Sequence, residues 1–300
     1  MPKADRPCLL LVNPVSGGGK SIKKYKQIQQ QLNDGGFQVR THISIDEVDL
    51  AHQVQNAHEP IVFLLGGDGS LRTAAEVIVM EKKNISLAPL PSGRGNDFCA
   101  ALGIPKKPEL AAAKVIEMAE QIDVDVISIN QQKVALGAVS IGIDAAAAEI
   151  SFEIQRSGNK WLKGAPLYIF SALKALISWQ ARDIQVSLDG GASEKRKIWL
   201  FVISNSGQFG GGMKISPTSK LQDGILEVIA VGEVSKFDFL RTLPKVFFGK
   251  HLSHPKLEMF STCEIFLESD VPILAFADGE PILATPLRVS ILPNALKILK

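Results

Sequence analysis

The stretch Ile61–Val77 limits what this chain can fold into more than any other part of the sequence. It begins with an apolar run that is typical of a buried strand, and its second half has the apolar spacing of a helix. Between them lies the turn Gly66-Gly67-Asp68-Gly69-Ser70, in which the glycines leave the backbone N–H groups uncovered. An anion can approach these groups at the start of the helix, where the helix dipole also favours negative charge. The turn therefore predicts a phosphate site.

Asp68 is the ionisable residue of this turn. A carboxylate repels a bare phosphate, but it can hold a magnesium ion that accompanies the phosphates of a nucleotide. We therefore expect a site for a metal–nucleotide complex. The alternative is a tight glycine-rich turn in which Asp68 only caps the following helix.

Two further turns with glycines follow predicted strands. Residues 13–20 (NPVSGGGK) follow the apolar run 8–12, and residues 91–98 (PSGRGNDF) follow the strand 86–90. Strands that alternate with helices form a parallel sheet, and ligands bind where its strands end. The first turn is not a Walker A loop, because Pro14 stands where that pattern needs its first glycine. In the third turn, the Arg94 guanidinium suits phosphate oxygens and Asp97 suits a metal, although Asp97 can also be a helix cap.

The second half of the chain has a different pattern. From about Asp123, short alternating segments separated by Gly, Asn and Pro predict an antiparallel sandwich, and 300 residues suit two domains. Two helical insertions, 161–182 and 235–251, interrupt these strands. Lys163, Gly164, Pro166 and Lys174 interrupt the apolar run of the first insertion, so we predict no transmembrane span there.

Both insertions are amphipathic. The first has Ile169, Phe170, Leu173, Leu176 and Ile177 on one face and Ser171, Lys174 and Ser178 opposite. The second opens with a capping pattern, Ser235 and Asp238, and sets Phe239, Leu243 and Val246 beside Lys236, Arg241, Lys245 and Lys250. Such helices can lie on an anionic membrane surface, or they can pack on the sheet with a solvated basic face.

Composition excludes several classes of protein. A net charge of +2 gives no reason to expect a nucleic-acid partner, and three widely spaced cysteines form no disulfide framework or zinc site. The five histidines have no metal-ligand spacing. The apolar run near the N-terminus is too short for a secretory signal, so we predict a cytoplasmic protein. The sequence leaves a homodimer possible.

Five motifs occur in order between positions 9 and 281: LLVNPVSGGGK, LLGGDGS, LAPLPSGRGNDFCAALGIP, NSGQFGGGMKISPTSKLQDGILEV and FADGEP. By these motifs the chain resembles the diacylglycerol kinase catalytic-domain superfamily, which includes the bacterial YegS-like lipid kinases, bacterial diacylglycerol kinases and sphingosine kinases. The resemblance implies an α/β nucleotide-binding domain of the NAD kinase and diacylglycerol kinase kind, followed by an antiparallel β-sandwich domain. We expect the first domain at 1–124, with the tail 293–300 returning to it, and the lipid-substrate domain at 125–292.

In that family the nucleotide lies between the two domains. The resemblance places ATP against Asn13, Thr41, Gly66, Gly67, Asp68, Gly69, Ser70, Gly93 and Arg94. It makes Asp278 the general base that takes the proton of the lipid hydroxyl, with Glu280 supporting the magnesium and its waters; the alternative for Asp278-Gly279 is a plain turn between strands. It also implies a structural magnesium site at the carbonyls of Lys220 and Ile225 and the carboxylate of Asp223.

The chain departs from the family pattern at two places. Arg72 and Thr73 replace the Asn-Glu pair that follows GGDG in many bacterial members, which bears on the lipid preference. Gln222 replaces an aspartate at the structural metal site, which would weaken that site.

The leading hypothesis is an ATP- and Mg²⁺-dependent kinase that phosphorylates a hydroxyl of a membrane lipid and associates peripherally with an anionic membrane. Diacylglycerol, phosphatidylglycerol or a similar lipid would be the acceptor. Two alternatives stay open: an NAD-kinase-like enzyme that acts on a soluble nucleotide, and a regulator that binds nucleotide or lipid without catalysis.

Overall fold

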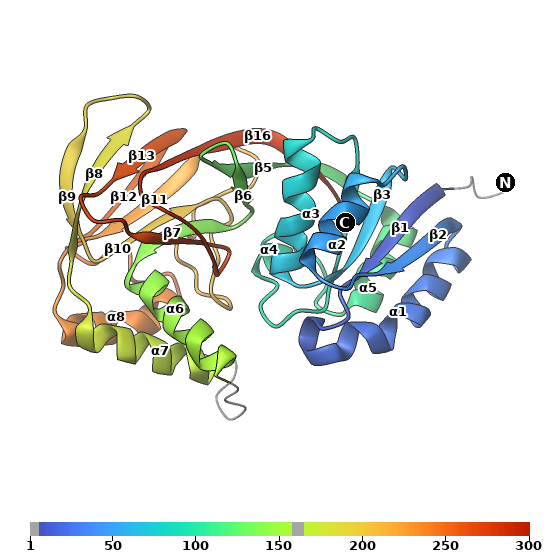
Figure 1. Cartoon of the computed structure of the whole chain (residues 1–300), viewed down its shortest axis with the longest axis horizontal. Helices are drawn as coiled ribbons and strands as arrows, with labels where there is room; N and C mark the ends of the chain where they lie inside the picture. The colour runs from blue at the N-terminus through green and yellow to red at the C-terminus, as the bar shows by residue number, and fades with distance from the viewer. Residues whose placement is uncertain (1–5, 158–164) are drawn as a thin grey trace. The chain divides into compact units, whose positions relative to one another are not determined.

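The structure, a computed structural model, describes residues 6–157 and 165–300 (Figure 1). The chain divides into two compact units. The first extends to Val126 and also contains Pro293–Lys300, and the second comprises Ile127–Leu292. Strands β5 (Gln121–Ile129) and β16 (Leu287–Leu299) contribute residues to both units, so the chain passes between the units twice.

The first unit is an α/β domain with a parallel sheet, as the alternation of strands and helices predicts. Its strands lie in the order β2-β1-β3-β4, and the carboxyl-terminal part of β16 lies beside β4. Helix α1 packs against α5 and α2 against α3. Strands β1, β3 and β4 are almost wholly buried, which is typical of a parallel sheet covered on both faces. The elements are β1 (Arg6–Val12), α1 (Ser16–Asp34), β2 (Phe37–Ile43), α2 (Glu47–Gln55), β3 (Ile61–Gly66), α3 (Asp68–Met80), β4 (Ser86–Pro91), α4 (Asp97–Ala101) and α5 (Pro108–Met118).

The second unit is a β-sandwich, which confirms the predicted fold class. One sheet has the order β12-β11-β10-β7-β14-β15; the other contains β5, β6, β16, β13, β8 and β9. Side chains from both sheets form one buried core, including Ile141, Phe201, Ile265 and Val289. The elements are β6 (Lys133–Ala135), β7 (Ala138–Gly142), α6 (Ile143–Arg156), α7 (Ala165–Ser178), β8 (Arg182–Leu188), β9 (Glu194–Ile198), β10 (Leu200–Ser204), β11 (Leu226–Val231), α8 (Lys236–Val246), β12 (Leu257–Thr262), β13 (Glu264–Glu268), β14 (Leu274–Ala277) and β15 (Glu280–Ala284).

Helix α7 is turned differently from what its apolar pattern predicts; residues 161–164 of this insertion lie outside the described residues. The side chains of Ile169, Phe170, Leu173 and Ile177 are exposed, whereas Ser171 is fully buried. Ala172, Ala175 and Leu176 pack in a cluster with Ile143 and Ala147 of α6. Small side chains allow the two helices to approach closely. Of the predicted apolar face, only Leu176 is buried, so the alternative in which this face packs on the sheet does not hold for α7.

Helix α8 begins as predicted. The Ser235 hydroxyl accepts a hydrogen bond from the Asp238 N–H at 3.1 Å, which confirms the N-cap. The predicted apolar stripe, Phe239, Leu243 and Val246, faces the interior of the unit, as the alternative interpretation of this helix has it. In the part of the chain that the structure describes, no helix is both long and apolar enough to cross a bilayer.

Candidate functional site

Three turns leave the carboxyl edge of the sheet in the first unit. The strands that lead into them are neighbours, with Val12 of β1 opposite Leu65 of β3, and Gly66 of β3 opposite Pro91 of β4. The Asn13 N–H donates to the Leu65 carbonyl at 3.0 Å, and the Ser92 N–H donates to the Gly66 carbonyl at 2.8 Å. The turns predicted after Val12, Leu65 and Leu90 therefore lie side by side, although β3 and β4 each extend one residue further than predicted.

Side chains link these turns to one another. The Asn13 amide donates to the Ser70 hydroxyl at 2.7 Å, and the Ser92 hydroxyl donates to the Ser16 hydroxyl at 3.1 Å. Asp68 Oδ2 accepts a hydrogen bond from the Asn96 N–H at 2.6 Å. Each turn is thus hydrogen-bonded to at least one of the other two. These hydrogen bonds between protein groups fix the positions of the three turns.

Glycine is required where the turns touch. A Cβ on Gly93 would lie 2.7 Å from the Cα of Gly67, and a Cβ on Gly17 would lie 2.1 Å from the Ser92 carbonyl oxygen. Gly17 also has a φ of +61°, a conformation that other residues rarely adopt. The turns can approach this closely only because glycine has no side chain. The absence of side chains also leaves backbone N–H groups accessible to an anion.

Two carboxylates flank Gly95 in the third turn. A Cβ on Gly95 would lie 3.0 Å from Asp68 Oδ2 and 3.8 Å from Asp97 Oδ2. The N-cap residues of α3 and α4 are Gly67 and Asn96, so Asp68 and Asp97 are each the first residue of their helix and not its cap. The alternative, that Asp68 and Asp97 serve only as helix caps, is therefore wrong. The structure instead brings their two carboxylates to the same glycine.

These carboxylates fit a magnesium ion that is shared with a nucleotide. Among the described residues, no group of three or more His, Cys, Asp or Glu side chains is placed to hold a metal. Magnesium usually keeps several waters and is bound by one or two carboxylates together with substrate phosphates. Asp68 and Asp97 meet this requirement, and the site suits the metal–nucleotide complex better than a metal alone.

Arg94 and Thr41 occupy different positions relative to the turns. Arg94 lies exposed in the third turn, whereas Thr41 lies on β2 opposite Leu10, before the end of the strand. The Thr41 Oγ1 atom is buried and has no hydrogen-bond partner among the described residues. Contact of either residue with a nucleotide stays a prediction.

In the second unit, Asp278 lies in the hairpin turn between β14 and β15. Asp278 and Gly279 have φ values of +51° and +85°, as a two-residue turn of this kind needs. The carboxylate accepts backbone hydrogen bonds from Leu136 at 2.7 Å, Gly137 at 2.7 Å and Ala138 at 3.1 Å. The backbone at Asp278-Gly279 is thus a turn between strands, as the alternative interpretation has it. Three backbone N–H groups also hold the Asp278 carboxylate in one orientation. Glu280 follows as the first residue of β15 and is partly buried.

The predicted structural metal residues lie in the loop before β11. Asp223 Oδ1 accepts a hydrogen bond from the Ile225 N–H at 3.1 Å, so the carboxylate folds back onto its own loop. Lys220 lies exposed three positions earlier. Metal binding by Lys220, Asp223 and Ile225 remains a prediction.

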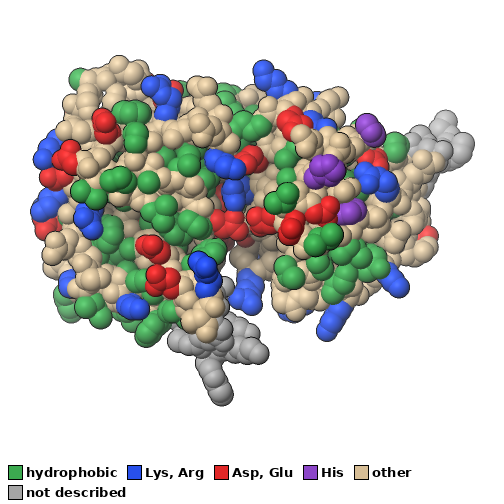
Figure 2. Space-filling view, in the orientation of Figure 1, with side chains coloured by type: hydrophobic (Ala, Val, Ile, Leu, Met, Phe, Trp, Pro, Cys, Tyr) green, Lys and Arg blue, Asp and Glu red, His purple; other side chains and the backbone are tan. Residues whose placement is uncertain are grey.

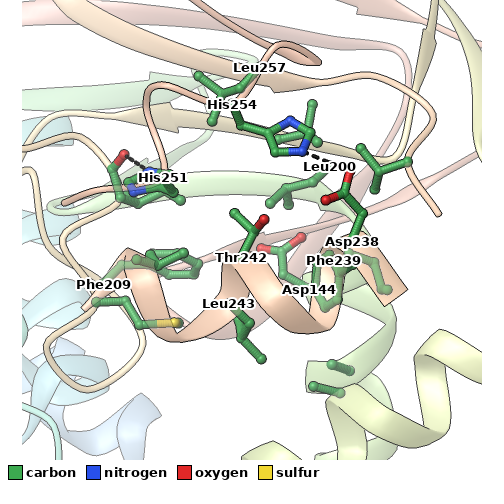
Figure 3. Close-up of a pocket in the computed structure, with 18 residues that line it drawn as sticks. Asp144, Leu200, Phe209, Asp238, Phe239, Thr242, Leu243, His251, His254 and Leu257 are labelled. Atoms are coloured by element: carbon green, nitrogen blue, oxygen red, sulfur yellow. Dashed lines mark hydrogen bonds and ion pairs between the residues drawn. The ribbon is translucent and has the colours of Figure 1, made fainter. Parts of the chain in front are cut away.

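An apolar pocket lies in the second unit between α6, α7, α8 and strands β10 and β11 (Figure 3). Its empty space is about 810 Å³, a figure that includes open solvent at the mouth. The pocket adjoins the Asp278 hairpin through Ala138. The Ala138 N–H donates to Asp278, and its side chain packs in one buried cluster with Met213 and Ile215, which line the pocket.

The sequence analysis missed the polar residues of this pocket. His254 pairs with Asp238 at 2.9 Å, and His251 is buried with its Nε2 3.0 Å from the Ile215 carbonyl oxygen. Burial lowers the pKa of His251. Asp144, in the first turn of α6, also lines the pocket. Asp144 stands at the start of an alanine-rich segment, and this pattern could have indicated the first turn of a helix. Helix α6 was not predicted, so its first-turn acid was missed.

Burial raises the pKa of Asp144 from 3.8 to about 6. At pH values between 3.8 and about 6, Asp144 keeps its proton in the folded state and loses it in the unfolded state. The free energy of unfolding therefore falls as the pH rises through this range. At pH 7.5 we expect Asp144→Asn to raise the free energy of unfolding by up to about 3 kcal/mol, and near pH 4 by much less. Urea unfolding at both pH values measures this, and equal stability of the two proteins at pH 7.5 would contradict it.

Comparisons with known proteins agree with both units. Residues 7–129 match the diacylglycerol kinase catalytic domain, and residues 137–300 match the YegS C-terminal NAD kinase beta sandwich-like domain. A diacylglycerol kinase of Mycobacterium tuberculosis (strain CDC 1551 / Oshkosh) is 26% identical over 297 residues, which cover 97% of this chain and 94% of that protein. A diacylglycerol kinase of Bacillus subtilis (strain 168) is 24% identical over 247 residues, which cover 81% of this chain and 80% of that protein.

The fold is shared with a solved structure. The crystal structure of a diacylglycerol kinase from Bacillus anthracis str. Sterne superposes with a TM-score of 0.75 at 20% identity, covering 98% of this chain and 96% of that one. The family resemblance drawn from the five sequence motifs is therefore confirmed. The chain belongs to the diacylglycerol kinase catalytic-domain superfamily of lipid kinases, and its second unit is of the YegS kind.

Proposed function

We propose that this protein transfers the γ-phosphoryl group of ATP to a hydroxyl of a membrane lipid, such as diacylglycerol or phosphatidylglycerol, and that it needs Mg²⁺. The observation that carries the proposal is the interlocked set of three turns with Asp68 and Asp97 beside Gly95. A phosphoryl-transfer enzyme works mainly by positioning and by stabilising charge, and these turns supply both.

The first unit would bind the nucleotide. The bare backbone around Gly67 and Gly93 would receive phosphate oxygens, and Arg94 would add a charge-assisted hydrogen bond. Asp68 and Asp97 would hold Mg²⁺, which neutralises negative charge on the β- and γ-phosphates when it is bound. Thr41 and Asn13 would complete the nucleotide contacts.

The second unit would bind the acceptor. As the acceptor oxygen forms its bond to the γ-phosphorus and the bond to the β-phosphate oxygen breaks, the hydroxyl proton would pass to Asp278. Three backbone donors fix the Asp278 carboxylate, so it needs no reorganisation before it accepts the proton. Glu280 would support the water network from the other side of the hairpin turn.

The apolar pocket favours a lipid over a soluble nucleotide as acceptor. It is lined mainly by aliphatic and aromatic side chains, and Ala138 joins it to the Asp278 hairpin. A hydrocarbon chain would gain free energy by leaving water for such a pocket, whereas a second nucleotide would find few polar partners there.

Phosphate transfer can be tested with both classes of acceptor. Purified protein with labelled ATP would be offered diacylglycerol, phosphatidylglycerol or NAD. We expect label in a lipid, and we expect loss of the reaction when EDTA removes the metal. Label in NAD alone would favour the NAD-kinase-like alternative, and tight Mg-ATP binding without turnover on any lipid would favour a non-catalytic regulator.

We also propose that α7 and α8 dock on an anionic membrane. The carbonyl of Ile177 in α7 accepts a hydrogen bond from the Lys236 ammonium of α8, so the two helices are neighbours. Exposed apolar side chains on these helices, and in the turn after α8, include Ile177, Phe237 and Phe248, which are 75%, 76% and 73% exposed. Lys174, Arg241, Lys245 and Lys250 are exposed on the same two segments. Figure 2 shows hydrophobic and basic side chains together on the surface where these helices lie.

Replacement of both Phe237 and Phe248 by Ser is expected to weaken binding to phosphatidylglycerol-containing vesicles at least tenfold, because each phenyl ring contributes about 1.5–3 kcal/mol when it leaves water. Vesicle sedimentation measures the affinity, which should also fall with salt. Val48→Ser is the matched control, since Val48 is 78% exposed on α2 in the first unit. Unchanged vesicle binding by the double variant would refute the docking surface.

A further inference from the structure

Asp144 is a partly satisfied acid of the apolar pocket, whose carboxylate accepts hydrogen bonds from the Ser140 side chain and the Ala145 backbone N–H. Its side chain is 9% exposed, and its Oδ1 atom has no hydrogen-bond partner among the described residues. Figure 3 shows it among the side chains that line the pocket, which include Thr242 of α8. A buried carboxylate oxygen without a donor is costly, and this cost has to be offset by a partner.

The other charged groups of the pocket wall do not supply that partner. Asp238 pairs with His254 at 2.9 Å, and His251 directs its Nε2 to the Ile215 carbonyl. As an acid in the first turn of α6, Asp144 interacts favourably with the helix dipole, but this role does not require an Oδ1 atom that is buried against an apolar pocket. Packing and ion pairs among the described residues thus leave the buried Oδ1 atom of Asp144 without a partner.

We propose that Asp144 determines acceptor specificity by accepting a hydrogen bond from a hydroxyl or amine that the lipid carries inside the pocket. This inference rests on the proposed function, which places the chain of the acceptor lipid in the pocket. A lipid with a plain hydrocarbon chain would leave the carboxylate oxygen unpaired, whereas a lipid with a second donor would satisfy it. The polar group therefore selects among acceptors of similar length.

The donor that Asp144 recognises is not the hydroxyl that is phosphorylated. Strand β7 runs from Ala138, which hydrogen-bonds Asp278, to Gly142, two residues before Asp144. At about 3.3 Å per residue, the strand alone separates these points by about 13 Å. Asp144 is therefore a specificity residue for a second group of the same lipid, remote from the reacting atoms.

Three probes of equal chain length separate the chemistry: 1-dodecanol, 1,12-dodecanediol and 12-amino-1-dodecanol. Calorimetry would measure their binding to the wild-type protein, to Asp144→Leu and to Asp144→Asn. Glu149→Gln is the matched control, because Glu149 is an exposed acid on the same helix. We expect the diol or the amino alcohol to bind the wild type about tenfold more tightly than 1-dodecanol, and the stronger of the two identifies the donor.

Asp144→Leu should abolish this preference, Asp144→Asn should keep part of it for the diol, and Glu149→Gln should leave it unchanged. Equal binding of all three probes to the wild type, or an undiminished preference in Asp144→Leu, would overturn the inference; the wild-type result alone decides if the Leu variant does not fold. Failure of every probe to bind, in protein that still phosphorylates a lipid, would overturn the placement of the chain in the pocket and the inference with it. Probe binding without lipid phosphorylation would instead overturn the proposed function.

Discussion

Asp68→Asn is expected to lower the rate of lipid phosphorylation by about 100-fold or more while the first unit stays folded. The substitution removes the negative charge that would hold Mg²⁺, yet the amide oxygen of Asn can still accept the hydrogen bond that the Asn96 N–H gives to Asp68 at 2.6 Å. The loss should therefore lie in catalysis and in Mg²⁺ dependence, and not in the melting temperature. A radiolabel assay over a range of Mg²⁺ concentrations, with thermal unfolding of the same preparation, measures both.

Asp46→Asn is the matched control for this variant. Asp46 caps α2 in the same unit by accepting the Asp49 N–H at 2.8 Å, and Asn is an equally good cap. The control should keep wild-type activity. Near wild-type lipid phosphorylation by Asp68→Asn would refute the assignment of Asp68 to the metal–nucleotide site.

Asp278→Asn is expected to reduce turnover by about 10²- to 10⁴-fold, because the amide cannot take the proton of the acceptor hydroxyl. It should also destabilise the second unit by about 1–3 kcal/mol, since the new NH₂ group would face a backbone N–H that now donates to the carboxylate. Activity and urea unfolding have to be measured together on this variant.

Gly279→Ala separates the two effects. Gly279 has a φ of +85°, and a Cβ there would meet nothing within 4 Å, so alanine strains the hairpin turn but leaves the Asp278 carboxylate intact. We expect this variant to lose stability with much smaller loss of turnover at temperatures where it is folded. If Gly279→Ala lost as much turnover as Asp278→Asn, the role of Asp278 would be structural and not that of a base.

Local patterns predicted the parts of the fold that depend on neighbours in sequence. The alternation of buried strands and helices in the first unit and the Ser235 cap appear as expected, and the turn at Asp278-Gly279 matches the alternative interpretation of that motif. Long-range pairing was harder to read. Helix α6, strand β12 and strand β15 were not predicted, because the apolar pattern of each is weak without its partner.

For the candidate functional site, too, local patterns could be predicted and long-range contacts could not. Glycines and acids in the turns pointed to phosphates and metal, and the structure places Asp68 and Asp97 around one glycine. The pocket could not be read from sequence, because its lining comes from segments between Ile143 and Leu257 whose apolar residues carry no spacing rule. Which face of α7 is buried could not be read from the sequence for a related reason: Ala172 and Ala175 pack against α6, and the larger apolar side chains stay exposed.

The return of the chain to the first unit has a consequence for protein synthesis. Ile298 of β16 pairs with Leu87 of β4, so the edge of the parallel sheet is covered by residues that lie more than two hundred positions later in sequence. A ribosome that has released residues 1–126 has therefore made a domain whose β4 edge is still bare, a state that invites pairing with other chains. The first unit cannot be completed during translation until residues 293–300 have emerged, and a fragment cut after Val126 should be produced with that segment fused to it.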